Sequence, residues 1–181
     1  MPMPKVRHTL ADYERLPEHV RADFIEGELV MAPAPTYWHE WLLMRFVWEV
    51  GAVLGPGKND RVFVSHFEVK TGSGEDAEAA QPDVVVLPEG TRPPHEKSKR
   101  PTPILVAEIL SPATASYDRG AKLRFYGRAG VREAWILDPV TKTIEVHDLR
   151  AARKRVYAGG DTAESRAVPG FRVDVAAFFA A

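Results

Sequence analysis

Apolar and polar positions in the first third of the chain follow two different periods. Residues 23–33 (DFIEGELVMAP) alternate around a central glycine, which predicts a tight hairpin or a bulged strand. Residues 37–54 repeat their apolar positions at the spacing of an amphipathic helix, which Gly55-Pro56-Gly57 ends. Upstream of both, Thr9 is the predicted N-cap of a short helix that ends at Pro17.

Two short apolar runs in the centre of the chain, at 84–87 and 104–110, predict two neighbouring buried strands. Each run carries one acid that hydrophobic patterning does not explain. Asp83 precedes the first run and Glu108 lies inside the second. The interval between the runs is a long loop rich in Pro, Lys and Arg, and long loops of this kind often carry function.

Further segments complete the predicted framework. Residues 61–72 predict one strand with a bulge at its Ser-His pair, and residues 71–80 predict a polar, exposed loop. A helix is expected over 119–128, followed by a hairpin over 132–149 with an Asp-Pro turn. Residues 150–160 add a basic turn and another short strand.

The C-terminal residues 169–181 predict a loop and a short apolar helix. No internal repeat or linker divides the chain, so a single domain over residues 1–181 is expected. The predicted fold class is α+β: a mixed sheet of roughly five to seven strands, with a long helix before the central runs and a shorter one after Lys122.

Composition narrows the classes of function. The 181 residues carry a net charge of −1 and no cysteine, which excludes disulfides and thiolate metal sites. The apolar runs are too short to span a bilayer, so a cytoplasmic protein without a membrane partner is expected. Because the net charge attracts no nucleic acid, any such binding needs local basic surfaces or a bound cation. The best basic segments are 92–100, with Lys97, Lys99 and Arg100, and 150–155.

The two unexplained acids suit one kind of chemistry. Carboxylates are hard oxygen ligands for Mg²⁺ or Mn²⁺, and such ions activate water and neutralise phosphate charge in phosphodiester hydrolysis. Lys122, in the first turns of the predicted helix, can reach back over the sheet toward Asp83 and Glu108. The alternative is structural: the two acids can pair with Lys122 or Arg124 as buried ion pairs without any catalysis.

Four segments resemble the PD-(D/E)XK superfamily, and within it a small bacterial Uma-type family. They are DFIEGELVMAPAPTYWH, QPDVVVL, VAEILSPATASYDRGAKLRFYGRAGVREAWILDP and PGFRVDVAAFF. This resemblance implies a restriction-endonuclease-like α/β sandwich, a mixed sheet flanked by helices. It also implies a metal-dependent endonuclease acting on DNA, with RNA not excluded. Asp83 and Glu108 would hold Mg²⁺ or Mn²⁺, with Lys122 as the catalytic lysine, because in this family the lysine has moved from the strand, here Leu110, to the following helix.

The chain departs from the family at the first acidic position. The family usually has Glu followed by Ile-Asp-Gly, whereas this chain has Asp23 followed by Phe-Ile-Glu-Gly. The first metal-holding acid is therefore either Asp23 or Glu26, and the sequence favours neither.

Secondary candidates each have an ordinary structural alternative. His39 matches a histidine of the family and could orient water or phosphate, but it is also a common kind of helix-start residue. Tyr126, one turn after Lys122, could line the site or belong to the core. Arg119 and Arg124 could contact DNA or be solvated.

Two hypotheses go beyond single residues. Restriction-like nucleases often form homodimers, so a homodimer through the Trp-rich helix or a sheet edge is considered by analogy. A catalytically silent nucleic-acid-binding or interaction module that keeps the nuclease fold is the alternative function.

Overall fold

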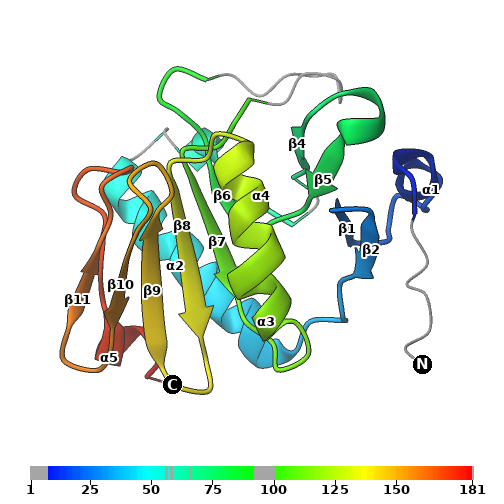
Figure 1. Ribbon diagram of the computed structural model, residues 1–181. Helices are drawn as coiled ribbons and strands as arrows, with labels where there is room; N and C mark the ends of the chain where they lie inside the picture. Colours follow the sequence, from blue (N-terminus) through cyan, green and yellow to red (C-terminus); the bar gives the residue numbers. More distant parts are fainter. Residues whose placement is uncertain (1–7, 56, 58, 66, 92–100, 181) are drawn as a thin grey trace.

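The computed structural model describes residues 8–55, 57, 59–65, 67–91 and 101–180 (Figure 1). Its central element is a six-stranded sheet in the order β10-β9-β8-β7-β6-β3. Strands β7 and β8 run parallel, and the other neighbours in this sheet are antiparallel. The strands are β3 (Val62–Val64), β6 (Val84–Val86), β7 (Leu105–Ile109), β8 (Glu133–Asp138), β9 (Thr143–Asp148) and β10 (Arg153–Tyr157). The predicted α+β class with a mixed sheet is confirmed.

Helices cover both faces of this sheet (Figure 1). Helix α2 (Tyr37–Leu54) has the predicted bounds, with Thr36 as N-cap and Gly55 at positive φ as its end. The other face is covered by one continuous run, α3 (Ala115–Tyr117), the π-helical turn η3 (Asp118–Lys122) and α4 (Leu123–Arg128). This run connects the parallel strands β7 and β8 and begins four residues earlier than the sequence predicted.

A second sheet has the order β2-β1-β5-β4. Its strands are β1 (Ala22–Ile25), β2 (Glu28–Met31), β4 (Val69–Thr71) and β5 (Glu78–Ala80). The hairpin β1–β2 and the short helix α1 (Leu10–Glu14), capped by Thr9, are as predicted. The single bulged strand expected over 61–72 is wrong, because the chain turns at Ser65, where φ is 41°, and continues in the other sheet.

The predicted exposed loop over 71–80 is also wrong in its second half. After the 3₁₀ turn η2 (Gly74–Asp76), residues of β5 pair with both β1 and β4, and Ala79 and Ala80 are buried. Alanine and glutamate have low strand propensity, so local pattern did not indicate a central strand here. Another 3₁₀ turn, η1 (Asn59–Arg61), leads into β3.

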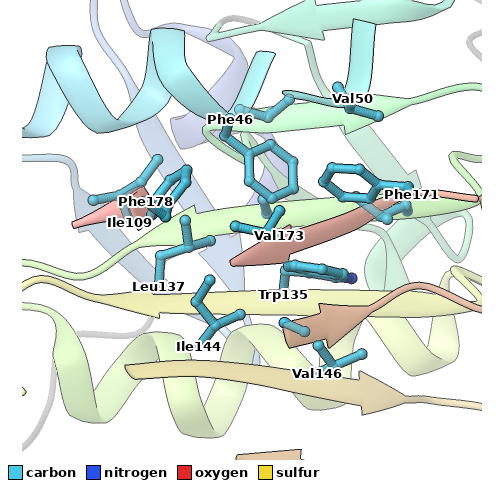
Figure 2. Packing of buried hydrophobic residues seen from close by; sticks show 14 of the residues in the cluster. Phe46, Val50, Ile109, Trp135, Leu137, Ile144, Val146, Phe171, Val173 and Phe178 are labelled. Atoms are coloured by element: carbon cyan, nitrogen blue, oxygen red, sulfur yellow. The ribbon is translucent and has the colours of Figure 1, made fainter. Parts of the chain in front are cut away.

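The C-terminal region closes the core on the α2 side. Strands β11 (Thr162–Glu164) and β12 (Arg172–Asp174) form a small antiparallel sheet that the sequence did not predict, followed by helix α5 (Val175–Phe178). Phe46 of α2, Trp135 of β8 and Phe171 pack their rings within 4.9–5.6 Å of one another (Figure 2). This aromatic cluster fixes α2 and the C-terminal segment on one face of the six-stranded sheet.

Alternation along the central strands decides where the acids point. Leu105, Ala107 and Ile109 of β7 belong to the α2-side core, whereas Val106 packs with Phe125 and Tyr126 of α4. Side chains two residues apart share a face of a strand, so Glu108 points to the α4 side with Val106. The same alternation in β6 puts Asp83 on that side with Val85. Both acids therefore lie at the end of the α4-covered face.

Candidate active site

A cavity of about 460 Å³ lies where β7 ends and α2 begins, beside the π-helical turn. Four acids and one lysine from separate parts of the chain line it, each between 3% and 7% exposed: Asp23, Asp83, Glu108, Asp118 and Lys122. Burial of this many charged groups costs free energy unless they are paired with one another. The contacts between these residues therefore determine how the site is built.

Strand register brings the two central acids together. Strands β6 and β7 are antiparallel with Val84 opposite Ala107, so that Asp83 comes beside Glu108. Asp23 comes from β1 of the other sheet, and the backbone N–H of Gln81 donates to its Oδ1 at 2.8 Å. The predicted proximity of Asp83 and Glu108 on neighbouring strands is confirmed.

Lys122 lies at the centre of the acid cluster. Its Nζ is 2.8 Å from Glu108 Oε1, 3.4 Å from Asp23 Oδ2 and 3.7 Å from Asp118 Oδ1. Burial lowers the pKa of Lys122, but the neighbouring charges of Asp23 and Glu108 outweigh it and hold that pKa well above its ordinary value. Three carboxylates from β1, β7 and the π-helical turn therefore converge on one cation.

Asp83 is held by donors on both of its oxygens. Arg21 Nη2 donates to Oδ1 at 3.1 Å, the backbone N–H of Ile109 donates to Oδ2 at 2.9 Å, and His39 Nε2 lies 3.2 Å from Oδ2. Burial raises the pKa of Asp83, but the bond and charge of His39, with Lys122 and Arg21, lower it to about 2. The same contact keeps the pKa of His39 above its ordinary value despite desolvation. Asp83 is thus an anion fixed in one orientation.

Glu108 has a different environment. Its Oε1 accepts a hydrogen bond from the Tyr126 hydroxyl and also takes the Lys122 contact. Burial is the largest influence and raises the pKa of Glu108 to about 8, against the opposing effect of Lys122. Tyr126 itself is buried and does not line the cavity, so it supports Glu108 from the core side.

Other sequence candidates lie away from the cavity. Glu26 is on the surface, paired with Arg124 at 3.0 Å and with Arg128 at 3.7 Å. Its backbone has a φ of 54° in the β1–β2 turn, directly after the strand that carries Asp23. Arg119 pairs with Asp138 and Glu145 on β8 and β9. The basic residues 153–155 form the exposed edge strand β10, and Lys97, Lys99 and Arg100 lie outside the described residues.

Sequence reasoning missed two charged residues of the site. Arg21 precedes Asp23 by two positions, and its Nη2 bonds both Asp83 and the backbone oxygen of Gln81. Asp118 precedes Lys122 by one helical turn and accepts a hydrogen bond from Thr114 Oγ1 at 2.7 Å. The four-residue spacing of Asp118 and Lys122 was a usable signal, whereas the contact of Arg21 with a residue 62 positions away was not.

The donor set suits a hard divalent cation, because it consists of buried carboxylates that already converge on a positive charge. In the described part of the chain, no three acids or histidines are placed to bind an ion directly. The reason is visible in the pairing, since Lys122 takes up three carboxylates while Arg21 and His39 take up Asp83. The acids are therefore chemically suited to a divalent cation, and in this structure they are paired with Lys122, Arg21 and His39.

Comparison with known proteins shows the family to which the chain belongs. The family model Uma2, described as "Putative restriction endonuclease", matches residues 10–176. The chain belongs to the Uma2 family. The matched region includes Asp23, Asp83, Glu108 and Lys122, so the family resemblance noted in the sequence is confirmed.

A solved structure shares the fold of this Uma2 protein. It is described as a putative nuclease belonging to DUF820 from Anabaena variabilis ATCC 29413. The two superpose with a TM-score of 0.75 at 21% identity, covering 94% of this chain and 97% of the other. A comparison with curated proteins gave no match. The restriction-endonuclease-like fold is therefore shown, and membership in Uma2 supports a nuclease-like function.

The described part of this Uma2 chain contains no helix with the length and apolar character that crossing a membrane requires.

Proposed function

We propose that this Uma2 protein is a metal-dependent endonuclease that hydrolyses DNA phosphodiester bonds. The observation that carries the proposal is the convergence of buried carboxylates from β1, β7 and the π-helical turn on a single cationic point, with Asp83 alongside. A site with this many buried acids is expensive to maintain, and strongly perturbed pKa values such as those of Asp83 and Glu108 are typical of functional sites.

Asp23, Asp83 and Glu108 would hold Mg²⁺ or Mn²⁺. When bound, such an ion lowers the pKa of a coordinated water and neutralises phosphate charge. Arg21, His39 and the N–H of Ile109 fix Asp83 as an anion, so that its orientation does not have to be set during the reaction. As a ligand, Glu108 would have to be ionised, and the Tyr126 hydroxyl would donate to its Oε1.

Lys122 is the proposed catalytic lysine. Its ammonium is held charged among the acids and can stabilise the negative charge that develops on a phosphate in the transition state. Asp118, bonded to Thr114, keeps a contact with Lys122 at the cavity wall. Asp118 is therefore assigned as a positioning residue for the lysine.

A non-catalytic nucleic-acid-binding module is the second candidate. One observation favours it: among the described residues the acids are already neutralised by Lys122, Arg21 and His39. A purely structural ion-pair network would look the same. The two functions differ in whether a divalent cation can displace these internal partners.

Calorimetric titration with Mn²⁺ separates the two candidates. Wild type, Asp83→Asn and Glu108→Gln are titrated, with Glu145→Gln as control, because Glu145 is a buried acid paired with Arg119 outside the cavity. Saturable binding in wild type and in the control, weakened at least about tenfold in the two site variants, supports the nuclease. Mg²⁺-dependent cleavage of DNA that is lost in both variants completes the test.

Two results would reject the nuclease. The first is wild-type protein that binds no Mn²⁺ in the presence of DNA. The second is cleavage that persists in both folded site variants. Nucleic-acid binding without any cation binding would favour the second candidate.

A further inference from the structure

One wall of the cavity is apolar and aromatic. It is formed by Trp38 at the start of α2, by Met31 of β2 and by Pro139 and Val140 of the β8–β9 turn. Met31, Val140 and Trp38 are exposed, so this apolar lining continues from the cavity to the surface.

Trp38 ends an aromatic column on α2. Its ring is stacked on Trp41 with centroids 4.8 Å apart and planes 9° from parallel, and Arg45 Cζ lies 5.0 Å from the centroid of Trp41. Positions 38, 41 and 45 follow one face of the helix toward its N-terminus. Of these three residues, Trp38 is the one that lines the cavity. The column therefore stops at the mouth of the candidate active site.

Among the described residues, the charges that line the cavity do not favour a DNA duplex. Its described lining contains three basic side chains, Arg21, His39 and Lys122, and each of them is paired with an acid of the site. The described wall thus has no uncommitted Lys or Arg for the backbone phosphates on which duplex binding depends. An aromatic surface beside a phosphate-cleaving site instead suits an unpaired base, since every base has a face that stacks.

We propose that Trp38 is a stacking platform for an unpaired nucleobase, and that the site takes single-stranded nucleic acid in preference to a duplex. This inference rests on the proposed nuclease function and names its substrate class. A base stacked on Trp38 extends the existing column by one layer and leaves the adjoining phosphate in the cavity beside the acids. The volume of about 460 Å³ is in the range of pockets that enclose a small ligand.

The test measures binding with chelator present, so that no cleavage occurs. The probe is a short single-stranded oligodeoxynucleotide containing 2-aminopurine, compared with the same sequence as a duplex. Wild type, Trp38→Ala and Trp38→Phe are compared with Trp48→Ala, the matched control. Trp48 is on the same helix and is 68% exposed, against 36% for Trp38, but it does not line the cavity. Thermal melting checks that each variant is folded.

We expect wild type to bind the single strand more tightly than the duplex and to change the 2-aminopurine fluorescence. Trp38→Ala should weaken single-strand binding about tenfold and abolish that change, because stacking on one aromatic ring contributes about that much. Trp38→Phe should retain part of both effects. Trp48→Ala should stay within about twofold of wild type.

Several results would overturn the stacking role. Tighter binding of the duplex, or equal single-strand affinity in Trp38→Ala and wild type, would do so. So would a wild-type dimer that dissociates in Trp38→Ala with single-strand affinity unchanged, since the apolar wall would then belong to a second copy of the chain. Cleavage assays keep the two proposals apart. If Trp38→Ala leaves the cleavage of a duplex unaffected, the stacking role of Trp38 is rejected and the nuclease function is kept. If single-strand binding depends on Trp38 but no Mg²⁺-dependent cleavage occurs, the stacking role is kept and the nuclease function is rejected.

Discussion

Two glutamates on the same sheet are almost equally buried and are treated in opposite ways. Glu133 of β8, on the α2 side, accepts hydrogen bonds on both oxygens from Trp135 Nε1, the Ser165 hydroxyl and the N–H groups of Arg166 and Ala167. Glu108 of β7, on the α4 side, takes the Tyr126 hydroxyl and the Lys122 ammonium on its Oε1 and lines the cavity.

The difference indicates a structural role for Glu133 and a binding role for Glu108. Glu133 is completed by neutral donors from its own chain, so it joins β8 to the segment before β12 and needs no ligand. Glu108 instead contacts the charged Lys122 and faces the cavity. A buried acid with a strongly shifted pKa beside a cavity is typical of a functional site.

Replacing each glutamate by glutamine should separate their roles. Glu133→Gln exchanges one acceptor oxygen for an NH₂ group that faces N–H donors, so the free energy of unfolding should fall by about 2 to 3 kcal/mol. Its Mn²⁺ affinity should stay at the wild-type value. Urea denaturation and calorimetry measure the two quantities. A Glu133→Gln protein with normal stability but weakened Mn²⁺ binding would contradict the structural role of Glu133 and assign it a role in metal binding.

The pH dependence of stability should reveal Glu108. Its pKa is raised from 4.5 to about 8 by burial, so between these values the folded protein keeps a proton that the unfolded chain releases. The stabilisation is complete below the lower value and is lost as pH rises toward the higher one, by up to about 1.4 kcal/mol per pH unit. Glu108→Gln should lack this loss. Urea denaturation of both proteins in chelator, between about pH 5 and about pH 8, measures it. Parallel curves for the two proteins would show that Glu108 is ionised throughout this range.

Asp23 and Glu26 allow the smallest and most specific comparison. Asp23→Asn should weaken Mn²⁺ binding about tenfold, because Asp23 lies beside Lys122 and lines the cavity. Glu26→Gln should leave Mn²⁺ affinity and cleavage unchanged, because Glu26 is paired with Arg124 and Arg128 on the surface. The same calorimetric titration serves for both. A loss confined to Glu26→Gln would assign the first metal acid to Glu26 instead.

Much of the framework followed from local pattern. The period of apolar residues predicted α2 with its bounds, and the β1–β2 and β8–β9 hairpins followed from alternation and turn residues. Strand β5 and the β11–β12 pair were missed, because strands of three residues with few β-branched residues show too little alternation of apolar and polar positions to be recognised. The division of 61–72 between two sheets was missed for another reason. The chain turns at Ser65 with a positive φ, and residues other than glycine rarely adopt positive φ, so the sequence did not indicate a turn there.

The sequence by itself predicted two neighbouring buried strands from the two short apolar runs, with Asp83 just before the first strand and Glu108 inside the second. It also placed Lys122 on the following helix. The tertiary structure alone decided that Asp23 enters the cavity while Glu26 stays on the surface, and that Arg21, Asp118 and Trp38 belong to the same cavity. The physical reason is range: periodicity reports the neighbours of a residue along one element, whereas this site forms where two sheets and two helices meet, through contacts that span up to 99 positions of the chain.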